Sequence, residues 1–415
     1  MKSSFNLRIP SLGQHLAEVA LLLMIEGMFL SRALLSVSIG LFFLSASMRL
    51  GIRVWLKQAV ADRLVWVGAA LWVMPFISGL WSVDLQAWSD VIRIKLPLLL
   101  LPLGGVGWQW DQKRTDRLGW TLVAGVCVGV IYSLLPWMQD GSSVKADYLR
   151  GGTLTTLLDN DRVRFSWLVV AMCWWMQARW KRATIQQRWI LAFLILFFVF
   201  YLHVLAVRIG LVCFYLLAAF VLIRQLAQST NRRWSVGALV LLVSLPVILY
   251  YSLPTFRARI DYIRYDWSHT FQGKYLPGGN DAIRMQSFQA AGELIRKNSL
   301  YGVGFGDIRS EMDSVYQGID PGLSSSDRIY PPNEWAVYGV GLGWIGLIAF
   351  SFCMIGLFFL RTDDPFRWRS WVLATILSLV TDIGLEVQYG VFLVPILLIF
   401  FRGASQGMKN QELYA

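Results

Sequence analysis

Apolar runs of membrane-spanning length recur along almost the whole chain, and they restrict its fold more than any other feature. A helix needs about 20 predominantly apolar residues to cross about 30 Å of hydrocarbon. Of the 415 residues, 56% are hydrophobic and only 15% are charged, and the mean hydropathy is +0.51. The pattern predicts an all-α polytopic membrane protein and excludes a soluble enzyme and a coiled coil.

About twelve membrane spans are expected, because apolar runs of roughly 17–25 residues, long enough to cross the hydrocarbon as helices, recur along the chain. We place them at residues 16–30, 33–48, 64–80, 91–106, 118–137, 163–178, 189–206, 209–227, 235–253, 335–360, 371–385 and 387–402. Basic residues gather in alternate short loops, which predicts that the N- and C-termini lie in the cytoplasm. The chain then divides into spans one to nine (1–253), a large loop outside the cytoplasm (254–334), and spans ten to twelve with a cytoplasmic tail (335–415).

The formal charge of +12 comes mainly from Lys and Arg in these short loops. Such a distribution is typical of topology signals, so the expected partners include membrane lipids and no nucleic acid. The four cysteines are isolated inside apolar spans and lack the spacing of a disulfide framework or a zinc site. We expect no metal and no cofactor.

Three basic residues stand at positions that topology signals do not explain. Arg208, in LAVRIGL, is apolar on both sides and lies where span seven ends and span eight begins; Arg93 and Lys95, in VIRIKL, lie at the outer start of span four. An ionisable residue at membrane depth is a functional candidate by default. The alternative is snorkelling to the interface or a structural ion pair.

Spans four, eight and ten would present their N-termini at the outer surface, where the helix dipole is positive. Helix N-termini and Arg side chains together form a site for anions, and a guanidinium can bind a phosphate through two parallel hydrogen bonds. The anion suggested for Arg93, Lys95 and Arg208 is a lipid phosphate or diphosphate.

The loop contains a predicted helix that Asn280 or Asp281 can cap and that runs to about Lys297. Arg284 falls in its first turn, near another positive helix end, although a solvated surface arginine is the alternative. A stripe of Phe288, Ala291 and Ile295 is expected on its buried face. The glycines after this helix, in YGVGFGD, predict a tight turn and no dinucleotide site, and the chain has no Walker motif.

Span ten begins after a pair of prolines in IYPPNEWAVYGVGLGWIGL. Asn333 is the expected N-cap of this helix, and Glu334 comes directly after it. The glycines of this segment are typical of close helix packing.

Three segments, in this order around the large loop, carry a resemblance to a known family: LAVRIGL, DAIRMQSFQAAGELIRKNSLYGVGFGDI and PPNEWAVYGVGLGWIGL. Over residues 202–347 the chain resembles the O-antigen ligase and O-antigen polymerase superfamily of bacterial envelope glycosyltransferases. Elsewhere the likeness rests on hydropathy and helix number, with a weaker similarity in TDIGLEVQYGV near the end.

The resemblance implies a periplasmic loop that covers a cavity at the outer leaflet. It implies transfer of a glycan from undecaprenyl diphosphate to an acceptor hydroxyl such as lipid A-core, with no metal and no nucleotide sugar. The intramembrane arginine of the family matches Arg208 and its loop arginine matches Arg284, and both are understood as contacts to the diphosphate. Arg93, Lys95 and Asn333 are further candidates for binding the diphosphate or glycan.

One position departs from the family. Its third motif normally reads PHN, and that histidine is replaced here by Pro332. The remaining candidates for a general base in this region are Glu334, Asp327 and Glu311, of which Glu334 is preferred; the alternative for Glu334 is a carboxylate that the helix dipole favours. Polymerisation of repeat units and non-catalytic binding or transport of a glycolipid are the alternative functions.

Overall fold

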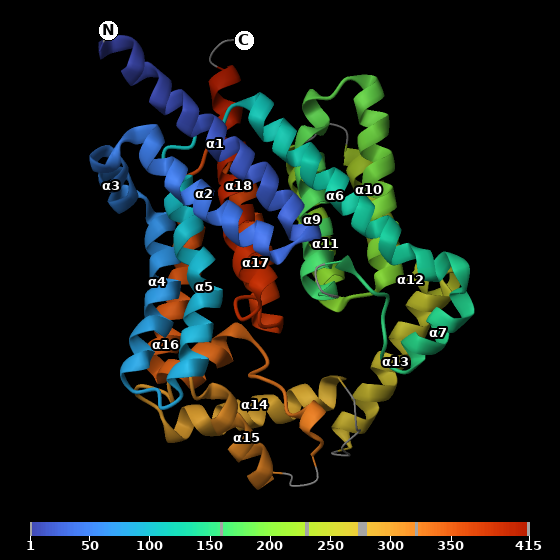
Figure 1. Ribbon diagram of the computed structural model, residues 1–415. Helices are drawn as coiled ribbons and strands as arrows, with labels where there is room; N and C mark the ends of the chain where they lie inside the picture. Colours follow the sequence, from blue (N-terminus) through green and yellow to red (C-terminus); the bar gives the residue numbers. More distant parts are fainter. Residues whose placement is uncertain (1, 158–160, 229–231, 273–279, 320–322, 413–415) are drawn as a thin grey trace. The chain divides into compact units, whose positions relative to one another are not determined.

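The computed structural model describes residues 2–157, 161–228, 232–272, 280–319 and 323–412, and it confirms an all-helical fold. Every regular element in these ranges is a helix, and no strand occurs in them (Figure 1). A helix is expected here, because in hydrocarbon the backbone N–H and C=O groups of each apolar segment must form their hydrogen bonds within that segment.

Eight of the described helical segments are long and apolar enough to cross a membrane. The expected number of about twelve spans therefore remains a prediction. Helix α5 carries Asp90, Arg93 and Lys95 among its apolar residues, and α17 has only 17 residues. The eight are Ser11–Leu30, Arg32–Leu50, Arg63–Leu80, Gln112–Gln139, Ile185–Leu205, Arg208–Gln228, Ser235–Ser252 and Glu334–Phe358.

The chain packs as two compact units. Unit 1 comprises Met1–Gly125 and Met285–Ala415, and unit 2 comprises Val126–Arg284. The sequence-based segments 1–253, 254–334 and 335–415 divide the chain by membrane topology, which is a different criterion, and they stay a prediction.

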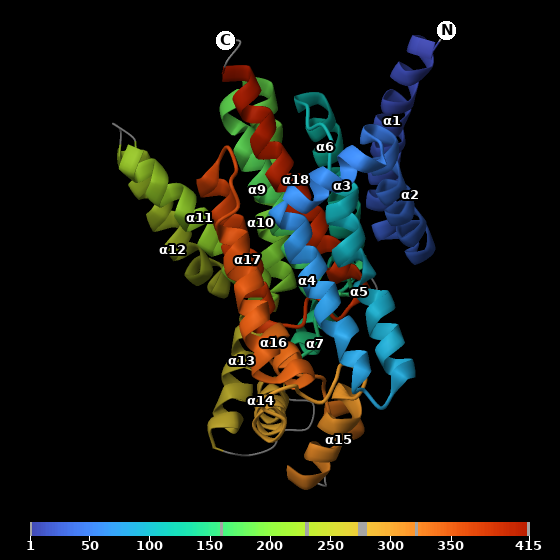
Figure 2. The same cartoon turned by 90° about the vertical axis from the view of Figure 1, so that its left-hand side faces the viewer.

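Unit 1 is built from helices at both ends of the sequence. Here α4 packs against α5 and α16, and α18 packs against α5 (Figures 1 and 2). The bounds are α1 Lys2–Leu30, α2 Arg32–Leu50, α3 Ile52–Ala61, α4 Arg63–Ile77, η1 Ser78–Leu80, α5 Leu85–Gly105, the part of α6 (Gln112–Gln139) before Val126, the part of α14 (Asn280–Lys297) after Arg284, α15 Ile308–Ile319, η3 Ser325–Asp327, α16 Glu334–Phe358, α17 Pro365–Thr381 and α18 Gln388–Glu412.

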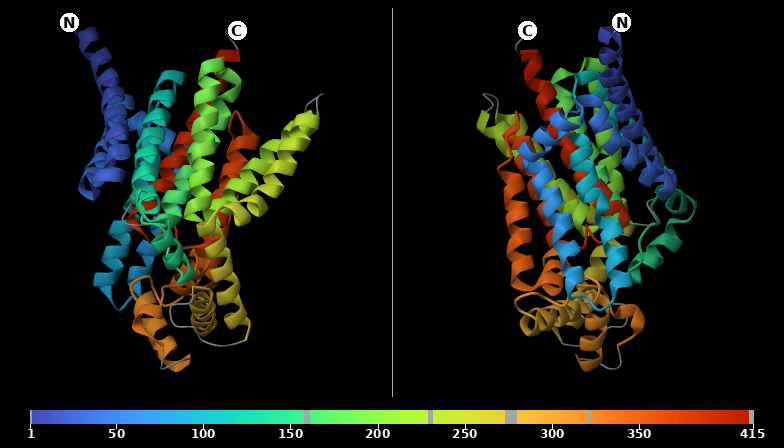
Figure 3. Two further views of the ribbon diagram at one scale, coloured as in Figure 1. Left: turned by 90° about the vertical axis from the view of Figure 1, so that its right-hand side faces the viewer. Right: turned by 60° about the vertical axis from the view of Figure 1, so that its left-hand side comes forward.

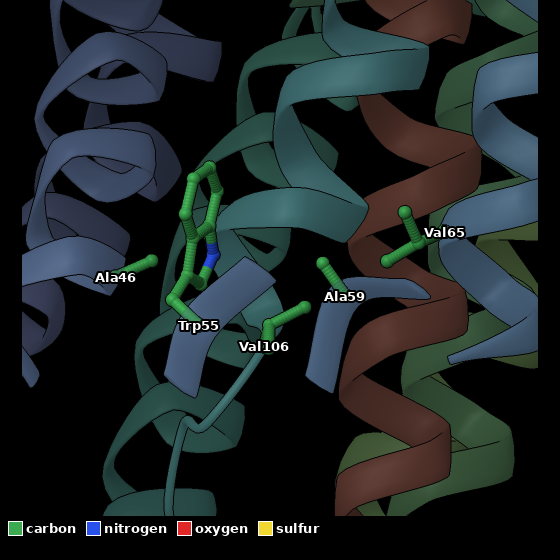
Figure 4. Close-up of a cluster of buried hydrophobic side chains, with 5 residues drawn as sticks. All are labelled: Ala46, Trp55, Ala59, Val65 and Val106. Atoms are coloured by element: carbon green, nitrogen blue, oxygen red, sulfur yellow. The ribbon is translucent and has the colours of Figure 1, made fainter. Parts of the chain in front are cut away.

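The short helix α3 is held in unit 1 by a cluster of buried side chains (Figure 4). Its Trp55 packs edge-on against Phe43, with ring centroids 5.6 Å apart, and its Nε1 donates to the Leu103 carbonyl at 3.1 Å. The cluster consists of Ala46, Trp55, Ala59, Val65 and Val106. Trp55 and Ala59 are four residues apart, so a single face of α3 is buried while the rest is exposed.

Helix α16 is broken at Gly343, whose φ of 63° and ψ of −150° lie outside the helical region. The 298–307 loop, the turn that connects α14 to α15, fills this break. Its Val303 and Gly304 N–H groups donate to the carbonyls of Val340 and Gly341 at 2.9 and 3.0 Å. The glycine-rich turn expected here is thus confirmed, and it satisfies backbone carbonyls that the broken helix cannot satisfy itself.

The other side of the 298–307 loop binds the connection between α4 and α5. The Asp307 carboxylate accepts from the backbone N–H groups of Val83 and Asp84 at 2.7 and 2.8 Å, and Ser78 Oγ accepts from the Phe305 N–H at 3.0 Å. Three helices of unit 1 are therefore fixed together at one end by this single loop.

Unit 2 is a separate helical assembly. Helices α11 and α12 form an antiparallel pair that Figure 3 (left) shows clearly, while α9 packs against both α10 and α11. The bounds are the part of α6 from Val126, α7 Gly141–Leu149, α9 Arg162–Arg179, η2 Trp180–Arg182, α10 Ile185–Leu205, α11 Arg208–Gln228, α12 Arg232–Ser252, α13 Pro254–Phe271 and the part of α14 up to Arg284.

The helix predicted in the loop segment is confirmed as α14, which runs from Asn280 to Lys297. Its expected buried stripe is wrong in one member, because Phe288 is 47% exposed. Ala291 is buried and Ile295 is half-buried, and Ala290 and Leu294 complete the buried face.

Candidate functional site

Arg208 is the first residue of α11, at a break that the hydropathy pattern correctly places between two spans. Helix α10 ends at Leu205, and Ala206 adopts the left-handed conformation with φ 51°, the one such non-glycine residue in the described ranges. This conformation costs an L-residue about 1–2 kcal/mol. The tight turn places the Arg208 guanidinium at the positive end of the α11 dipole.

Arg208 forms an ion pair with Asp281 of α14, at 2.7 Å between Nη1 and Oδ1. The Asp281 side chain is 16% exposed and that of Arg208 is 39% exposed. The Asp281 N–H in turn donates to Oδ2 of Asp266 on α13 at 2.9 Å, and Asp266 is fully buried. The structural ion pair considered for Arg208 is therefore present, and it joins the starts of α11 and α14.

A second arginine of unit 2, Arg259 on α13, is half-buried and lies within range of the Arg208 charge. Burial lowers the pKa of Arg259, and the positive charges of Arg208 and Arg162 lower it further. Arg259 donates to the Gly151 carbonyl at 3.1 Å and lies over the Tyr262 ring, 5.3 Å from its centroid.

Arg162 stands at the start of α9, where its guanidinium donates to Thr153 Oγ1. We call Arg162, Arg208 and Arg259 the arginine cluster; its members come from α9, α11 and α13. Like charges held together in a half-buried place repel one another, and a bound anion would relieve that repulsion. The N-termini of α9 and α11 add partial positive charge at two of the three residues.

Tyr148 of α7 bonds to the last turn of α10, close to the turn that precedes Arg208. It is fully buried, and its hydroxyl donates to the Val204 carbonyl at 2.8 Å, in the last turn of α10. Burial raises the pKa of the Tyr148 phenol, an effect that the Leu154 N–H and the charges of Arg259 and Arg162 oppose. A neutral phenol bonded to the end of α10 fixes the helix just before the Ala206 turn.

Arg284, the other arginine that the resemblance singles out, is half-buried on α14. It lies three residues after Asp281, so the two side chains project from neighbouring positions of one helix. Unit 2 therefore contains both predicted arginines, with Asp281 as the residue that connects α14 to Arg208.

The predicted residues of α5 lie in unit 1 and have different environments. The Arg93 side chain is 79% exposed and pairs with Asp90 at 2.9 Å, one turn earlier on the same helix. Lys95 is fully buried, and its Nζ donates to the Leu385 carbonyl at 2.9 Å and to the Glu386 carboxylate. Its ammonium also lies 5.2 Å from the Tyr338 ring centroid.

The start of α16 is hydrogen-bonded to the end of α17 and to the link between α17 and α18, through Asn333 and Glu334. Asn333 caps α16, as predicted, by accepting from the Ala336 N–H at 2.8 Å, and its side-chain amide donates to the Val380 carbonyl at 2.9 Å. Glu334 is fully buried, and its carboxylate accepts from the Leu385 N–H. Lys95 and Glu334 thus hold consecutive residues of one non-helical segment.

We call Lys95, Glu334 and Glu386 the lysine–glutamate cluster. Burial raises the pKa of Glu386, against the attraction of the Lys95 charge. Burial also raises the pKa of Tyr330, and the charges of Glu386 and Glu334 act in the same direction. Both carboxyl groups therefore lie in a buried site in which Lys95 supplies the positive charge.

The other candidates for a proton acceptor differ in exposure. Asp327 is buried and Glu311 is exposed on α15. Pro332 is buried. Each of the three histidines uses its Nδ1 to bond the carbonyl four residues earlier in its own helix: His15 to Ser11, His203 to Val199 and His269 to Tyr265.

Sequence reasoning missed four residues of the unit 2 site: Asp281 as a partner, Asp266, Arg162 and Arg259. Their segments are polar, so their charges carry no penalty that would single them out. One signal in the sequence could have identified Arg162. Asp161 precedes an apolar run, as an N-cap does, and this places Arg162 and Arg164 in the first turn of a helix. In the described residues, no group of three or more His, Cys, Asp or Glu side chains is placed to hold a metal ion.

Comparisons with protein-family models and with curated proteins give no match for this chain. Its function is therefore inferred from the geometry of the two units and from the motif resemblance. The feature with the clearest chemical meaning is the arginine cluster at two helix N-termini.

Proposed function

We propose that this chain is a glycosyltransferase of the O-antigen ligase type. It would move a glycan from undecaprenyl diphosphate to an acceptor hydroxyl, such as that of lipid A-core, at the periplasmic face of the bacterial inner membrane. The observation that carries this proposal is the arginine cluster, since a diphosphate is the membrane-anchored anion that such a group of guanidiniums would bind most strongly. The motif resemblance of Arg208 and Arg284 supports the same ligand.

In the proposed reaction, the acceptor oxygen attacks the anomeric carbon of the glycan. The bond between that carbon and the phosphate oxygen breaks, and the diphosphate leaves with the electron pair. Negative charge grows on the diphosphate as the bond breaks, so fixed arginines stabilise the transition state more than the ground state. The diphosphate is a good leaving group and requires no general acid.

The proton of the acceptor hydroxyl must pass to a base, which contributes about 100- to 10,000-fold to the rate. Glu334 is the candidate from the sequence, but its carboxylate is buried and bound to a backbone N–H. Asp281 is the candidate from the geometry, because it contacts Arg208 directly. On this proposal, the diphosphate displaces Asp281 from Arg208 and leaves the carboxylate able to accept the proton.

A non-catalytic glycolipid-binding or transport protein is the second candidate, and Pro332 in place of the family histidine favours it. Repeat-unit polymerisation would use the same residues and differ in the acceptor. The three functions share the diphosphate site and differ in the step after the donor has bound.

The test is transfer by purified protein in nanodiscs, from a native polyprenyl-diphosphate glycan to candidate acceptors. Wild type is compared with Arg208→Ala, Arg284→Ala and Pro332→His. We expect the activation free energy of transfer to rise by about 2–4 kcal/mol in each arginine variant. The rate of transfer should therefore fall roughly 30- to 1,000-fold.

The products decide between the functions. A single transfer identifies a ligase and a ladder of products identifies a polymerase. Wild-type rates in both arginine variants, at equal expression, would contradict the proposal; binding without transfer by wild type and by Pro332→His would favour the non-catalytic protein.

A further inference from the structure

Unit 1 contains a second polar site at the end of its helix bundle remote from the 298–307 loop. A cavity of about 310 Å³ opens between the C-terminal ends of α3 and α5 and the middle of α18, and this volume is within the size range of small-ligand sites. Helix α4 starts at this cavity and reaches the 298–307 loop at Ser78, about 22 Å further along. The cavity wall shares no residue with the proposed reaction.

The cavity wall combines charge with aromatic rings. Arg402 of α18 donates through Nη1 to both carboxylate oxygens of Asp62, at 2.7 and 2.8 Å. Trp108 and Trp110 line the same space, edge to face, with ring centroids 6.1 Å apart. The indole Nε1 of Trp108 is buried and has no acceptor in the described part of the chain.

A buried arginine lies directly behind this wall. Arg49 is 5% exposed and donates to the carbonyls of Gly104 and Val106, on either side of the lining residue Gly105. It also stacks against Trp108 at 5.8 Å. No carboxylate in the described residues pairs with Arg49, and its Nε has no acceptor there.

An uncompensated buried charge is costly unless a counter-ion is nearby. The Arg49 charge behind the wall and the Arg402 guanidinium in the wall favour an anion with hydrogen-bond acceptors in the cavity. The cavity residues carry one positive and one negative charge, Arg402 and Asp62, so the surplus positive charge is that of Arg49. A phosphate group has the charge and oxygen acceptors that this arrangement would bind.

The adjacent helix α3 indicates where such a phosphate comes from. Ile52, Leu56 and Val60 are 56, 50 and 65% exposed, and Arg53 and Lys57 lie among them, also exposed. Exposed apolar residues interleaved with basic ones are typical of a helix at the level of lipid headgroups. The cavity opens beside this helix, because Gln58 and Ala61 of α3 line it.

We propose that this cavity binds the phosphodiester headgroup of a membrane phospholipid. On the topology proposed above, the headgroup belongs to the cytoplasmic leaflet. The site is independent of glycan transfer, and the lipid would fix α3, α5 and α18 to the membrane surface.

Gln58 allows a test that leaves the buried residues untouched, because it lines the cavity and is exposed. Native mass spectrometry of full-length protein titrated with dioleoyl phosphatidylglycerol measures the affinity of the first bound lipid. We expect Gln58→Glu to weaken it about fivefold and Gln58→Lys to strengthen it by a similar factor, as expected for one charge near a phosphate. Arg49→Gln should also weaken it.

The matched control is Gln186, an exposed glutamine of α10 in unit 2. Gln186→Glu and Gln186→Lys make the same charge changes and should leave the affinity unchanged. Equal effects of the Gln58 and Gln186 pairs would overturn the proposal.

Two further ligands separate phosphate from lipid. A monogalactosyl diacylglycerol, which lacks phosphate, should bind much more weakly than phosphatidylglycerol; equal binding would overturn phosphate recognition. Soluble glycerol 3-phosphate should not displace the lipid at matched concentration, and displacement would assign the cavity to a soluble phosphate instead.

Discussion

The arginine cluster of unit 2 holds three like charges in one region, and the helix dipoles add partial positive charge at Arg162 and Arg208. Arg208 has Asp281 as a counter-ion, and the charges of Arg208 and Arg162 lower the pKa of Arg259. An arrangement of this kind lowers protein stability unless an anion enters it. The arginine cluster is therefore better suited to binding a multiply charged ligand than to holding the fold together.

Asp281 is the residue whose chemical role can be separated from its structural one. Replacing Asp281 by Asn removes the charge and keeps the size, so we expect donor binding to be retained while transfer falls at least about 100-fold. Glu334→Gln should lower the thermal midpoint and have little effect on the rate of transfer, because it alters a buried contact to Leu385. Both variants are measured for transfer, donor binding and melting; wild-type transfer by Asp281→Asn would exclude it as the base.

At this scale the sequence predicted positions better than partners. The position of Arg208 between two helices follows from hydropathy alone, and Asn333 as a cap follows from its place after two prolines. Lys95 was assigned to an anion site, and its partner Glu386 was not predicted, because the two residues are 291 positions apart and only the folded chain brings them together. The same holds for Arg259, whose neighbours come from α9 and α11.

Among the helices, α16 depends on one glycine. A Cβ on Gly343 would clash with the Ser299 carbonyl oxygen, and the φ of +63° strains any L side chain. We expect Gly343→Ala to destabilise the protein by about 1–3 kcal/mol. Gly356→Ala, in the same helix with nothing within 4 Å, should be neutral or stabilise by up to about 1 kcal/mol. Melting in detergent compares the two; equal midpoints would show that the break is not required.

The buried pair Lys95–Glu386 joins α5 to the link between α17 and α18. Lys95→Met should destabilise by about 3–5 kcal/mol, because it leaves the Glu386 carboxyl without its cation. The double variant Lys95→Met/Glu386→Leu should recover most of that loss. Chemical denaturation in mixed micelles measures both, and additive losses in the double variant would mean that the two residues are not coupled.

The long apolar helices were predictable as elements, and the short ones were not. A span is recognisable because lipid requires about 20 apolar residues. Helices α3, α7, α13 and α15 are short or polar and are stabilised by packing, as Trp55 and Ala59 stabilise α3. Helices this short are marginal without such packing, so local propensity alone does not predict them.

For the whole molecule, the proposed topology places α15 and α3 on opposite sides of the membrane. Glu311 of α15 and Lys57 of α3 are both exposed, so single cysteines introduced there in a cysteine-free background should react differently. We expect an impermeant maleimide to label Glu311→Cys in intact spheroplasts and Lys57→Cys only after permeabilisation. Labelling of both residues from the same side would contradict the topology.

The central claim is that the arginine cluster binds the diphosphate of a lipid carrier, and binding tests it more directly than turnover. The measurement is the affinity of undecaprenyl diphosphate for purified protein in nanodiscs, for wild type, Arg208→Ala, Arg259→Ala and Arg257→Ala. Arg257 is the matched control, since it is 59% exposed on α13 and pairs with Asp261.

Loss of a charged hydrogen-bonding group costs about 1.5–3 kcal/mol. A diphosphate site at the arginine cluster therefore predicts affinities about 10- to 150-fold weaker for Arg208→Ala and Arg259→Ala, with Arg257→Ala equal to wild type. If all four proteins bind undecaprenyl diphosphate equally, or none binds it, the arginine cluster is not a diphosphate site.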